Sequence, residues 1–133
     1  MMTRDQCYAQ AAHKRVSDLK QKYEQEEQKL KTYGSMAHKL PVLIRSAGLA
    51  QALTFLYARQ LGLQGQLLTH LAETIGKEDD AHLLKDARNA PLREYMRLTQ
   101  QVLDALLWYK RFAQSVLGVQ PGEQTEEEVI ENG

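Results

Sequence analysis

The stretch Tyr33–Arg59, with the sequence YGSMAHKLPVLIRSAGLAQALTFLYAR, is the most apolar part of this chain and contains no acidic residue. It lies within a longer run, residues 28–72, in which 45 consecutive positions carry neither Asp nor Glu. This acid-free run includes five basic residues: Lys29, Lys31, Lys39, Arg45 and Arg59. The central third of the chain is therefore both apolar and positively charged.

The spacing of apolar residues on both sides of this stretch is helical. No segment alternates apolar and polar residues with the β-branched enrichment of strands, and proline occurs only at positions 41, 91 and 121. We predict an all-α protein that forms a single compact helical bundle of about five to six helices, with long first and last helices.

Helix boundaries are predicted from capping residues and glycines. The first helix begins after Thr3, which has capping-box spacing to Gln6, and runs for about thirty residues until Gly34 ends it at positive φ. Ser35 caps a helix over 36–47 that Pro41 kinks or shortens. Further helices are expected over 49–60, 63–75, 77–88 and 91–117, with Gly48 at positive φ in the first junction.

Length and composition indicate one domain of ordinary globular character. The chain has 133 residues, 26% of them charged, and a single cysteine, Cys7, which fits a reducing compartment. We find no secretory signal and no apolar run long enough to span a membrane, so a cytoplasmic location is expected.

The net charge of zero combines a basic main part of the chain with an acidic tail. Residues 123–133 contain five glutamates and no base, whereas residues 1–122 contain 17 basic and 12 acidic residues, a net charge of +5. We predict a helical domain over residues 1–120. The tail over residues 121–133 is too acidic and too poor in aromatic residues to fold alone, and is expected to be disordered.

No set of residues supports catalysis, a cofactor or a metal site. The four histidines are scattered, and His70 with Glu73 is interpreted as a surface pair. Asp79 and Asp80 are interpreted as acids at a helix start rather than metal ligands. Cys7 has no nearby histidine, and no glycine-rich phosphate loop is present. We therefore predict a protein without enzymatic activity or small-molecule substrate.

The acid-free run has two interpretations. Apolar helices carry few charges, and those that remain are basic by chance. Alternatively, the run forms a positive face for the backbone of RNA or DNA, which would bind without reading sequence and weaken with salt. Tyr33 and Tyr57 could stack on bases, although their spacing is more typical of core or interface aromatics.

Several motifs of the central stretch resemble the small α-helical subunit of the Cmr effector complex, type III-B CRISPR–Cas. They are TyrGlySer (33–35), LysLeuPro (39–41), ValLeuIleArg (42–45) and GlyLeuAlaGlnAlaLeuThrPheLeu (48–56). The resemblance extends less specifically to Ala11, Ala12, Val16 and TrpTyrLysArgPhe (108–112), covers roughly residues 5–118 and leaves out the acidic tail.

This resemblance implies a non-catalytic subunit of an RNA-guided antiviral complex. Copies would stack head to tail beside other Cmr subunits and line the groove in which guide RNA and target RNA pair. Lys39, Arg45 and Arg59 are the expected phosphate contacts, with Arg15 and Lys14 as weaker candidates. The residues Pro41, Gly48, Leu49, Gln51 and Phe55 are interpreted as structural.

Two other classes of protein stay open. A self-assembling helical bundle or an adaptor for another helical protein would keep the fold and have no RNA face. A small helical enzyme of the mutase kind would need several arginines and a Glu or Gln converging on a buried pocket, which a sequence does not show.

Overall fold

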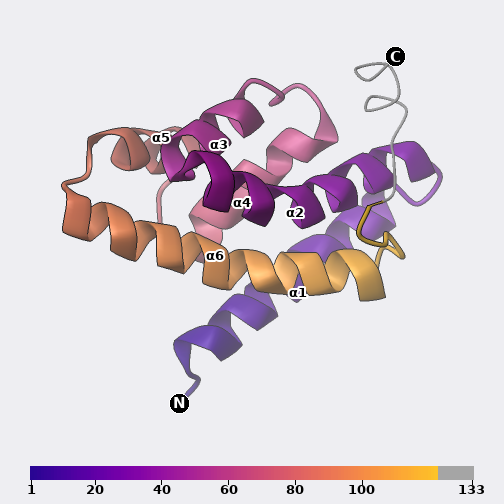
Figure 1. Ribbon diagram of the computed structural model, residues 1–133. Coiled ribbons are helices and arrows are strands. Elements are labelled where there is room, and N and C mark those ends of the chain that lie inside the picture. Colours follow the sequence, from indigo (N-terminus) through magenta and orange to yellow (C-terminus); the bar gives the residue numbers. More distant parts are fainter. Residues whose placement is uncertain (123–133) are drawn as a thin grey trace.

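The computed structural model describes residues 1–122, and in these the chain forms helices joined by short turns (Figure 1). The elements are α1 (Arg4–Lys22), α2 (Glu27–Ala47), α3 (Leu49–Tyr57), the 3₁₀ helix η1 (Leu63–Gly65), α4 (Gln66–Thr74), α5 (Asp80–Asn89) and α6 (Leu92–Ser115). The predicted all-α bundle with long first and last helices is confirmed, since α1 has 19 residues and α6 has 24.

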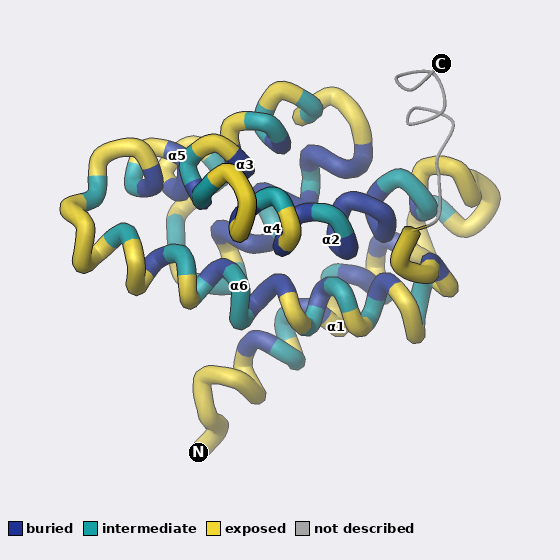
Figure 2. The backbone as a smooth tube through the Cα atoms, in the orientation of Figure 1, coloured by how far each residue is buried: buried dark blue, intermediate teal, exposed yellow. Residues whose placement is uncertain are grey.

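Helix α6 packs most extensively against α1 and α2. Figure 1 shows α1 crossing behind α6 at a steep angle. Helices α2 and α6 run antiparallel, because Tyr95 near the start of α6 bonds to Ala50 just beyond α2, whereas Val119 beyond α6 bonds to His38 in α2. The shorter helices α3, α4 and α5 cover the remaining side, so the buried positions gather between the long helices and this layer (Figure 2).

The core is built from one contiguous cluster of apolar side chains. Its largest fully buried members are Tyr33, Tyr109, Leu40, Leu49, Leu53, Leu56, Leu67, Leu68, Leu71, Leu83, Leu106 and Val16. Most of them lie within the acid-free run. The apolar character of that run is therefore explained by burial, because central helices must be apolar on most faces.

The prediction of one first helix reaching Gly34 is wrong. Helix α1 ends at Lys22, and the chain turns at Tyr23 before α2 begins at Glu27. The charges explain the break. Lys20 and Lys22 occupy the last turn of α1, where positive charges interact favourably with the helix dipole. Glu27 occupies the first turn of α2, where a negative charge is favourable.

Gly34 and Ser35 lie inside α2 rather than at a helix boundary, so their predicted roles as stop and cap are also wrong. Gly34 does not have a positive φ, and Ser35 is buried. A Cβ atom on residue 34 would lie 2.8 Å from Cβ of Val119, so glycine is required here by close packing and not by a turn. Pro41 is also contained within α2, which continues to Ala47.

Gly48 joins α2 to α3 at φ 90°, which confirms the predicted positive φ at this junction. Its N–H donates to the carbonyl of Ile44 and thus closes α2. The phenolic oxygen of Tyr95 accepts a hydrogen bond from the N–H of Ala50 at 3.1 Å, which satisfies one of the free donors at the start of α3.

The remaining boundaries agree with the predictions within a few residues. Helix α3 ends at Tyr57 rather than at residue 60, and the helix expected over 63–75 is divided into η1 and α4. The capping box of Thr3 and Gln6 and the acidic start of α5, where Asp79 accepts from the N–H of His82, are both present. Of the acidic tail, residues 123–133 lie outside the described part of the chain.

Candidate nucleic-acid interface

The five predicted phosphate contacts fall on two parts of the fold. Lys39 and Arg45 lie on α2, and Arg59 lies in the turn that follows α3. Helix α2 packs against both α3 and η1, so the elements that carry or flank these three residues are in contact. Lys14 and Arg15 lie instead on α1.

Arg45 is exposed in the last turn of α2. Lys39 is half-buried, and Val42, three residues from each of them, is 63% exposed. Residues three apart are neighbours on a helix surface, so this part of α2 presents an apolar side chain flanked by two cations. The apolar stems of Lys and Arg can pack beside Val42 while their charged ends reach solvent.

Arg59 is held in place by Phe55 of the preceding helix, α3. Its Nη1 donates to the carbonyl of Phe55 at 3.2 Å, and its guanidinium carbon lies 3.7 Å from the centre of the Phe55 ring. This stacking places the planar group on an aromatic face, an arrangement that Arg favours and Lys cannot reproduce. The guanidinium is therefore pre-oriented, which lowers the entropy cost of a phosphate contact.

The turn that carries Arg59 is closely packed. Gly65 lies against it so tightly that a Cβ atom would be 2.4 Å from Cα of Gln60. Backbone N–H groups of Gly62 and Gly65 donate to the carbonyls of Arg59 and Gly62, each at 3.0 Å. At the tip of this turn Leu61 is fully exposed.

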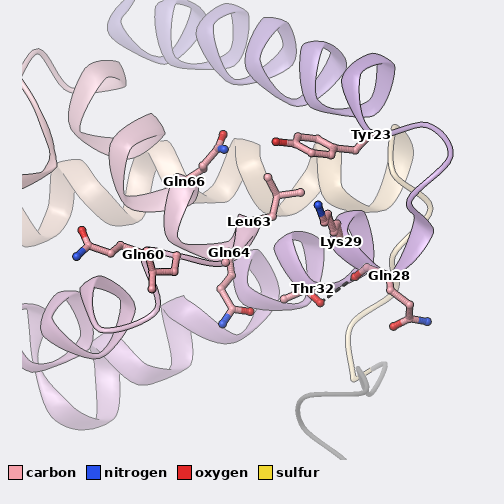
Figure 3. A pocket seen from close by; sticks show the side chains of 10 residues that line it. Tyr23, Gln28, Lys29, Thr32, Gln60, Leu63, Gln64 and Gln66 are labelled. Atoms are coloured by element: carbon pink, nitrogen blue, oxygen red, sulfur yellow. Dashed lines mark hydrogen bonds between the residues drawn. The ribbon is translucent and has the colours of Figure 1, made fainter.

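A polar groove of about 400 Å³ adjoins this turn (Figure 3). Its walls are Tyr23, Gln28, Lys29, Thr32, residues 60–64 and Gln66. The charged member Lys29 forms an ion pair with Glu26 at 2.9 Å and lies 5.4 Å from the centre of the Tyr23 ring. In Figure 3 the hydroxyl of Tyr23 points across the groove towards the side of Gln66. Amide and hydroxyl groups both donate and accept, so the groove can bind sugar hydroxyls or base edges.

This groove has no counterpart among the features predicted from the sequence. Its walls come from three separate segments, and glutamine and threonine at these positions form no pattern with a chemical meaning. The one available signal was the clustering of Gln60, Gln64 and Gln66 within a short stretch free of acids.

Arg15 is engaged by two partners within the protein. Its Nε donates to Glu73 at 3.3 Å and its Nη1 donates to the carbonyl of Ala11. Glu73 therefore pairs with Arg15, and not with His70 as the sequence suggested. Lys14 is exposed beside Arg15 on α1.

His70 belongs to a partly buried polar cluster with Tyr33, Tyr109 and Thr74. The Tyr33 hydroxyl lies 2.7 Å from His70 Nδ1, and Thr74 Oγ1 donates to the His70 carbonyl at 2.7 Å. Since that bond uses the only proton of Thr74, the hydroxyl of Tyr109 is the donor in the 2.7 Å bond to Thr74 Oγ1. Tyr33 is fully buried, so its interpretation as a core aromatic is correct and it cannot stack on a base.

Burial determines the protonation of this cluster. It lowers the pKa of His70 to about 4, with a further contribution from the nearby positive charge of Arg15. Burial also raises the pKa of Tyr109 to about 12 and that of Tyr33 well above its usual range. His70 is therefore neutral at pH 7, and its Nδ1 shares a hydrogen bond with the Tyr33 hydroxyl.

Within residues 1–122, no group of three His, Cys, Asp or Glu side chains is arranged to hold a metal ion. His82 lies 2.6 Å from Asp79 and 2.9 Å from Glu78, and Asp79 caps α5. None of the helices in the described part of the chain is long and apolar enough to cross a membrane.

Known proteins are similar to this chain in sequence and in fold. The sequence profile of the family described as CRISPR-associated protein (Cas_Cmr5) matches residues 4–116. The chain belongs to this family. The predicted resemblance is thereby confirmed, and the Cas_Cmr5 match ends before the acidic tail begins.

A curated member of the Cas_Cmr5 family, the CRISPR system Cmr subunit Cmr5 of Thermus thermophilus, is 42% identical over 117 residues. The alignment covers 88% of this chain and 98% of that protein. The crystal structure of a CRISPR-associated Cmr5 family protein from Thermus thermophilus superposes with a TM-score of 0.77. It has 42% sequence identity and covers 87% of this chain and 98% of the other.

Proposed function

We propose that this protein is a non-catalytic subunit of a type III-B CRISPR Cmr effector complex that lines the groove for guide RNA and target RNA. The support for membership of a Cmr complex is its Cas_Cmr5 family and the 42% identical relative, which is itself a Cmr subunit. Its role there is to hold RNA, while catalysis belongs to other subunits.

The observation that carries the RNA contact is the position of the acid-free run. Residues 28–72 form most of α2, all of α3 and η1 and most of α4, and α2 packs against the other three. Lys39, Arg45 and Arg59 thus belong to a packed part of the fold whose sequence contains no carboxylate. Such a surface attracts phosphates without reading bases.

The two weaker candidates, Arg15 and Lys14, differ in how available they are to a phosphate. The guanidinium of Arg15 is engaged with Glu73 and the Ala11 carbonyl, so a phosphate would have to compete with these partners. Lys14 is exposed and stays in the proposal as a secondary contact from α1.

Exposed apolar side chains support stacking of copies beside other Cmr subunits. Leu61 is fully exposed on the turn after α3, whereas Leu92 and Met96 are 75% and 63% exposed, one helical turn apart on α6. Large apolar side chains on two different elements are what a head-to-tail stack requires, because its two contact surfaces are not alike.

The test uses the assembled complex. The triple variant Lys39→Glu, Arg45→Glu, Arg59→Glu should lose most of its retained RNA. It should also reduce the slope of log affinity against log salt by about two to three, close to one for each phosphate contact removed. A matched control reverses Lys85, Arg88 and Arg93, which lie on α5 and α6, and so makes the same change in net charge.

Equal RNA retention and equal salt slopes in the two triple variants would contradict the proposed RNA face. The protein would then act by assembly alone, as a helical adaptor without nucleic-acid contact. The exposed side chains of Leu61, Leu92 and Met96 would be the surfaces to examine for that role.

A further inference from the structure

The groove beside the Arg59 turn offers polar groups that the proposed phosphate contacts do not use. Tyr23, the start of α2, the turn over residues 60–64 and the start of α4 form its walls (Figure 3). Among these described wall residues Lys29 alone is charged, and its ammonium lies 2.9 Å from a carboxylate oxygen of Glu26 at the surface. A wall with so little net charge suits the neutral part of a ligand better than a phosphate.

The shape of the groove is fixed by close packing. A Cβ atom on Gly65 would lie 2.4 Å from Cα of Gln60, and the wall residues Leu63 and Gln64 are only 8% and 5% exposed. The volume of about 400 Å³ lies within the range of roughly 300–1,000 Å³ that is usual for small-molecule sites. The groove therefore has room for one nucleoside, and its polar groups are oriented before a ligand binds.

The hydroxyl of Thr32 presents an acceptor to the groove. Its Oγ1 donates to the carbonyl of Gln28 at 2.8 Å, the bond that is dashed in Figure 3. A hydroxyl has one proton, so the remaining lone pairs of Thr32 Oγ1 only accept, and a ligand group beside them must donate. The 2′-hydroxyl of ribose is such a donor, and deoxyribose has no equivalent group.

The other polar side chains suit the edge of a base. The ammonium groups of Lys22 and Lys29 each lie 5.4 Å from the centre of the Tyr23 ring, so its hydroxyl, which points across the groove, is the part available to a ligand (Figure 3). The amides of Gln60 and Gln66 both donate and accept, as base edges do. Base edges are open to such contacts in an unpaired, unstacked nucleotide.

We propose that this groove binds the ribose and base of one unpaired ribonucleotide, and that the Thr32 hydroxyl accepts a hydrogen bond from its 2′-hydroxyl. This inference rests on the proposed function and deepens it. The basic side chains hold the backbone of either nucleic acid, whereas the groove selects RNA over DNA. Arg59 directly precedes Gln60 of the groove wall, so a strand bound at Arg59 passes next to the groove.

The experiment follows binding to the isotope-labelled full chain through its backbone amide shifts. The probe is an oligouridylate of about ten nucleotides, a length within the usual range of single-strand sites. The same sequence is also used as a deoxyribose strand, which lacks the 2′-hydroxyl, and as a 2′-O-methyl strand, which lacks the proton of that group.

Three variants isolate the role of Thr32. Thr32→Val removes the hydroxyl at nearly constant volume, and Thr32→Ser keeps it. The matched control is Thr99→Val, because Thr99 Oγ1 makes the same 2.8 Å bond to the carbonyl four residues earlier, on α6, which contributes no residue to the groove walls.

The original protein should bind the RNA strand about three- to tenfold more tightly than the other two strands, the worth of one net hydrogen bond. The amides of Thr32, Gln60 and Gln66 should shift with RNA and much less with the other strands. Thr32→Val should lower the affinity for RNA to that for the deoxyribose strand, and change the latter by less than about twofold. Thr32→Ser and Thr99→Val should behave like the original protein.

An RNA preference that survives Thr32→Val, or equal affinity of the original protein for all three strands, overturns the inference. Shifts confined to residues 39–45 and 59 also overturn it and leave the RNA face intact. If RNA at millimolar concentration shifts neither region, the groove inference fails, and the triple variant in the assembled complex decides the RNA face separately.

Discussion

Val119 packs onto Gly34 so closely that a side chain at residue 34 could not be accommodated without movement of the segment that follows α6. The three atoms that would lie nearest to a Cβ at residue 34 all belong to Val119, at 2.8 to 3.1 Å. One glycine in the middle of α2 thus determines where the C-terminal end of the fold is fixed.

Replacing Gly34 with alanine should destabilise the protein despite the better helix propensity of alanine. Overpacking of a buried contact costs about 1–3 kcal/mol, more than the roughly 1 kcal/mol that alanine contributes within a helix. The free energy of unfolding is measured by urea denaturation. The control Gly62→Ala, where the nearest atom would be 3.6 Å away, should change it less. An additional Val119→Ala change should restore part of the loss; a Gly34→Ala protein as stable as the original would contradict the packing argument.

Replacing Gly48 with valine should lower the melting temperature. Gly48 has φ 90°, a region that β-branched residues avoid, and the Tyr95 hydroxyl would lie 3.2 Å from a new Cβ. A strained residue of this kind costs on the order of 1–3 kcal/mol. Gly48→Asn, which tolerates positive φ better, should be affected less. Equal melting temperatures for the valine and asparagine variants would show that the junction relaxes.

Acid should weaken the fold through His70. Its pKa is 6.5 when unfolded and about 4 when folded, so the unfolded chain binds the proton more tightly. The stabilisation is complete above about pH 6.5 and is lost as the pH falls towards 4. It amounts to roughly 3 kcal/mol over the whole range. Unfolding free energies of the original protein and of His70→Gln, which keeps a hydrogen-bonding group beside Tyr33, should converge as the pH falls. A difference that is independent of pH would refute this assignment.

Substitution of Arg45 should weaken RNA retention, whereas substitution of Arg15 should lower the stability of the fold. Arg45→Glu is expected to weaken RNA retention severalfold with little change in stability, because the side chain is exposed on α2. Arg15→Glu should instead destabilise the fold, since it places two carboxylates opposite each other at Glu73. Denaturation and RNA retention are measured on both variants. A larger loss of RNA from Arg15→Glu than from Arg45→Glu, at equal amounts of folded protein, would reverse the assignment.

Most of the helical architecture was predictable because its signals are local. Apolar spacing, the capping box at Thr3 and the glycine at residue 48 each depend on residues within one or two turns. The break between α1 and α2 also had a local signal, Lys20 and Lys22 followed by Glu26 and Glu27. It was overlooked because the segment contains neither glycine nor proline, and the apolar stripe continues past it to Leu30.

The candidate site was predictable only as a charge distribution. The sequence predicted Lys39, Arg45 and Arg59 as phosphate contacts and Arg15 as a weaker candidate, but the pairing of Arg15 with Glu73 became visible only in the fold. The polar groove next to the Arg59 turn was not identified because Tyr23, Thr32 and Gln66 are brought together by packing rather than by spacing.

The sequence by itself determined the helical fold class, the family and the separation of charge between the central run and the acidic tail, because each depends on residue type and order alone. Only the tertiary structure decided that Gly34 is a packing glycine, that Arg15 is engaged and that Val119 is anchored on α2 beside Lys39. Each of these depends on atoms from distant segments meeting within a few ångströms, and the energy of such contacts has no counterpart in local sequence.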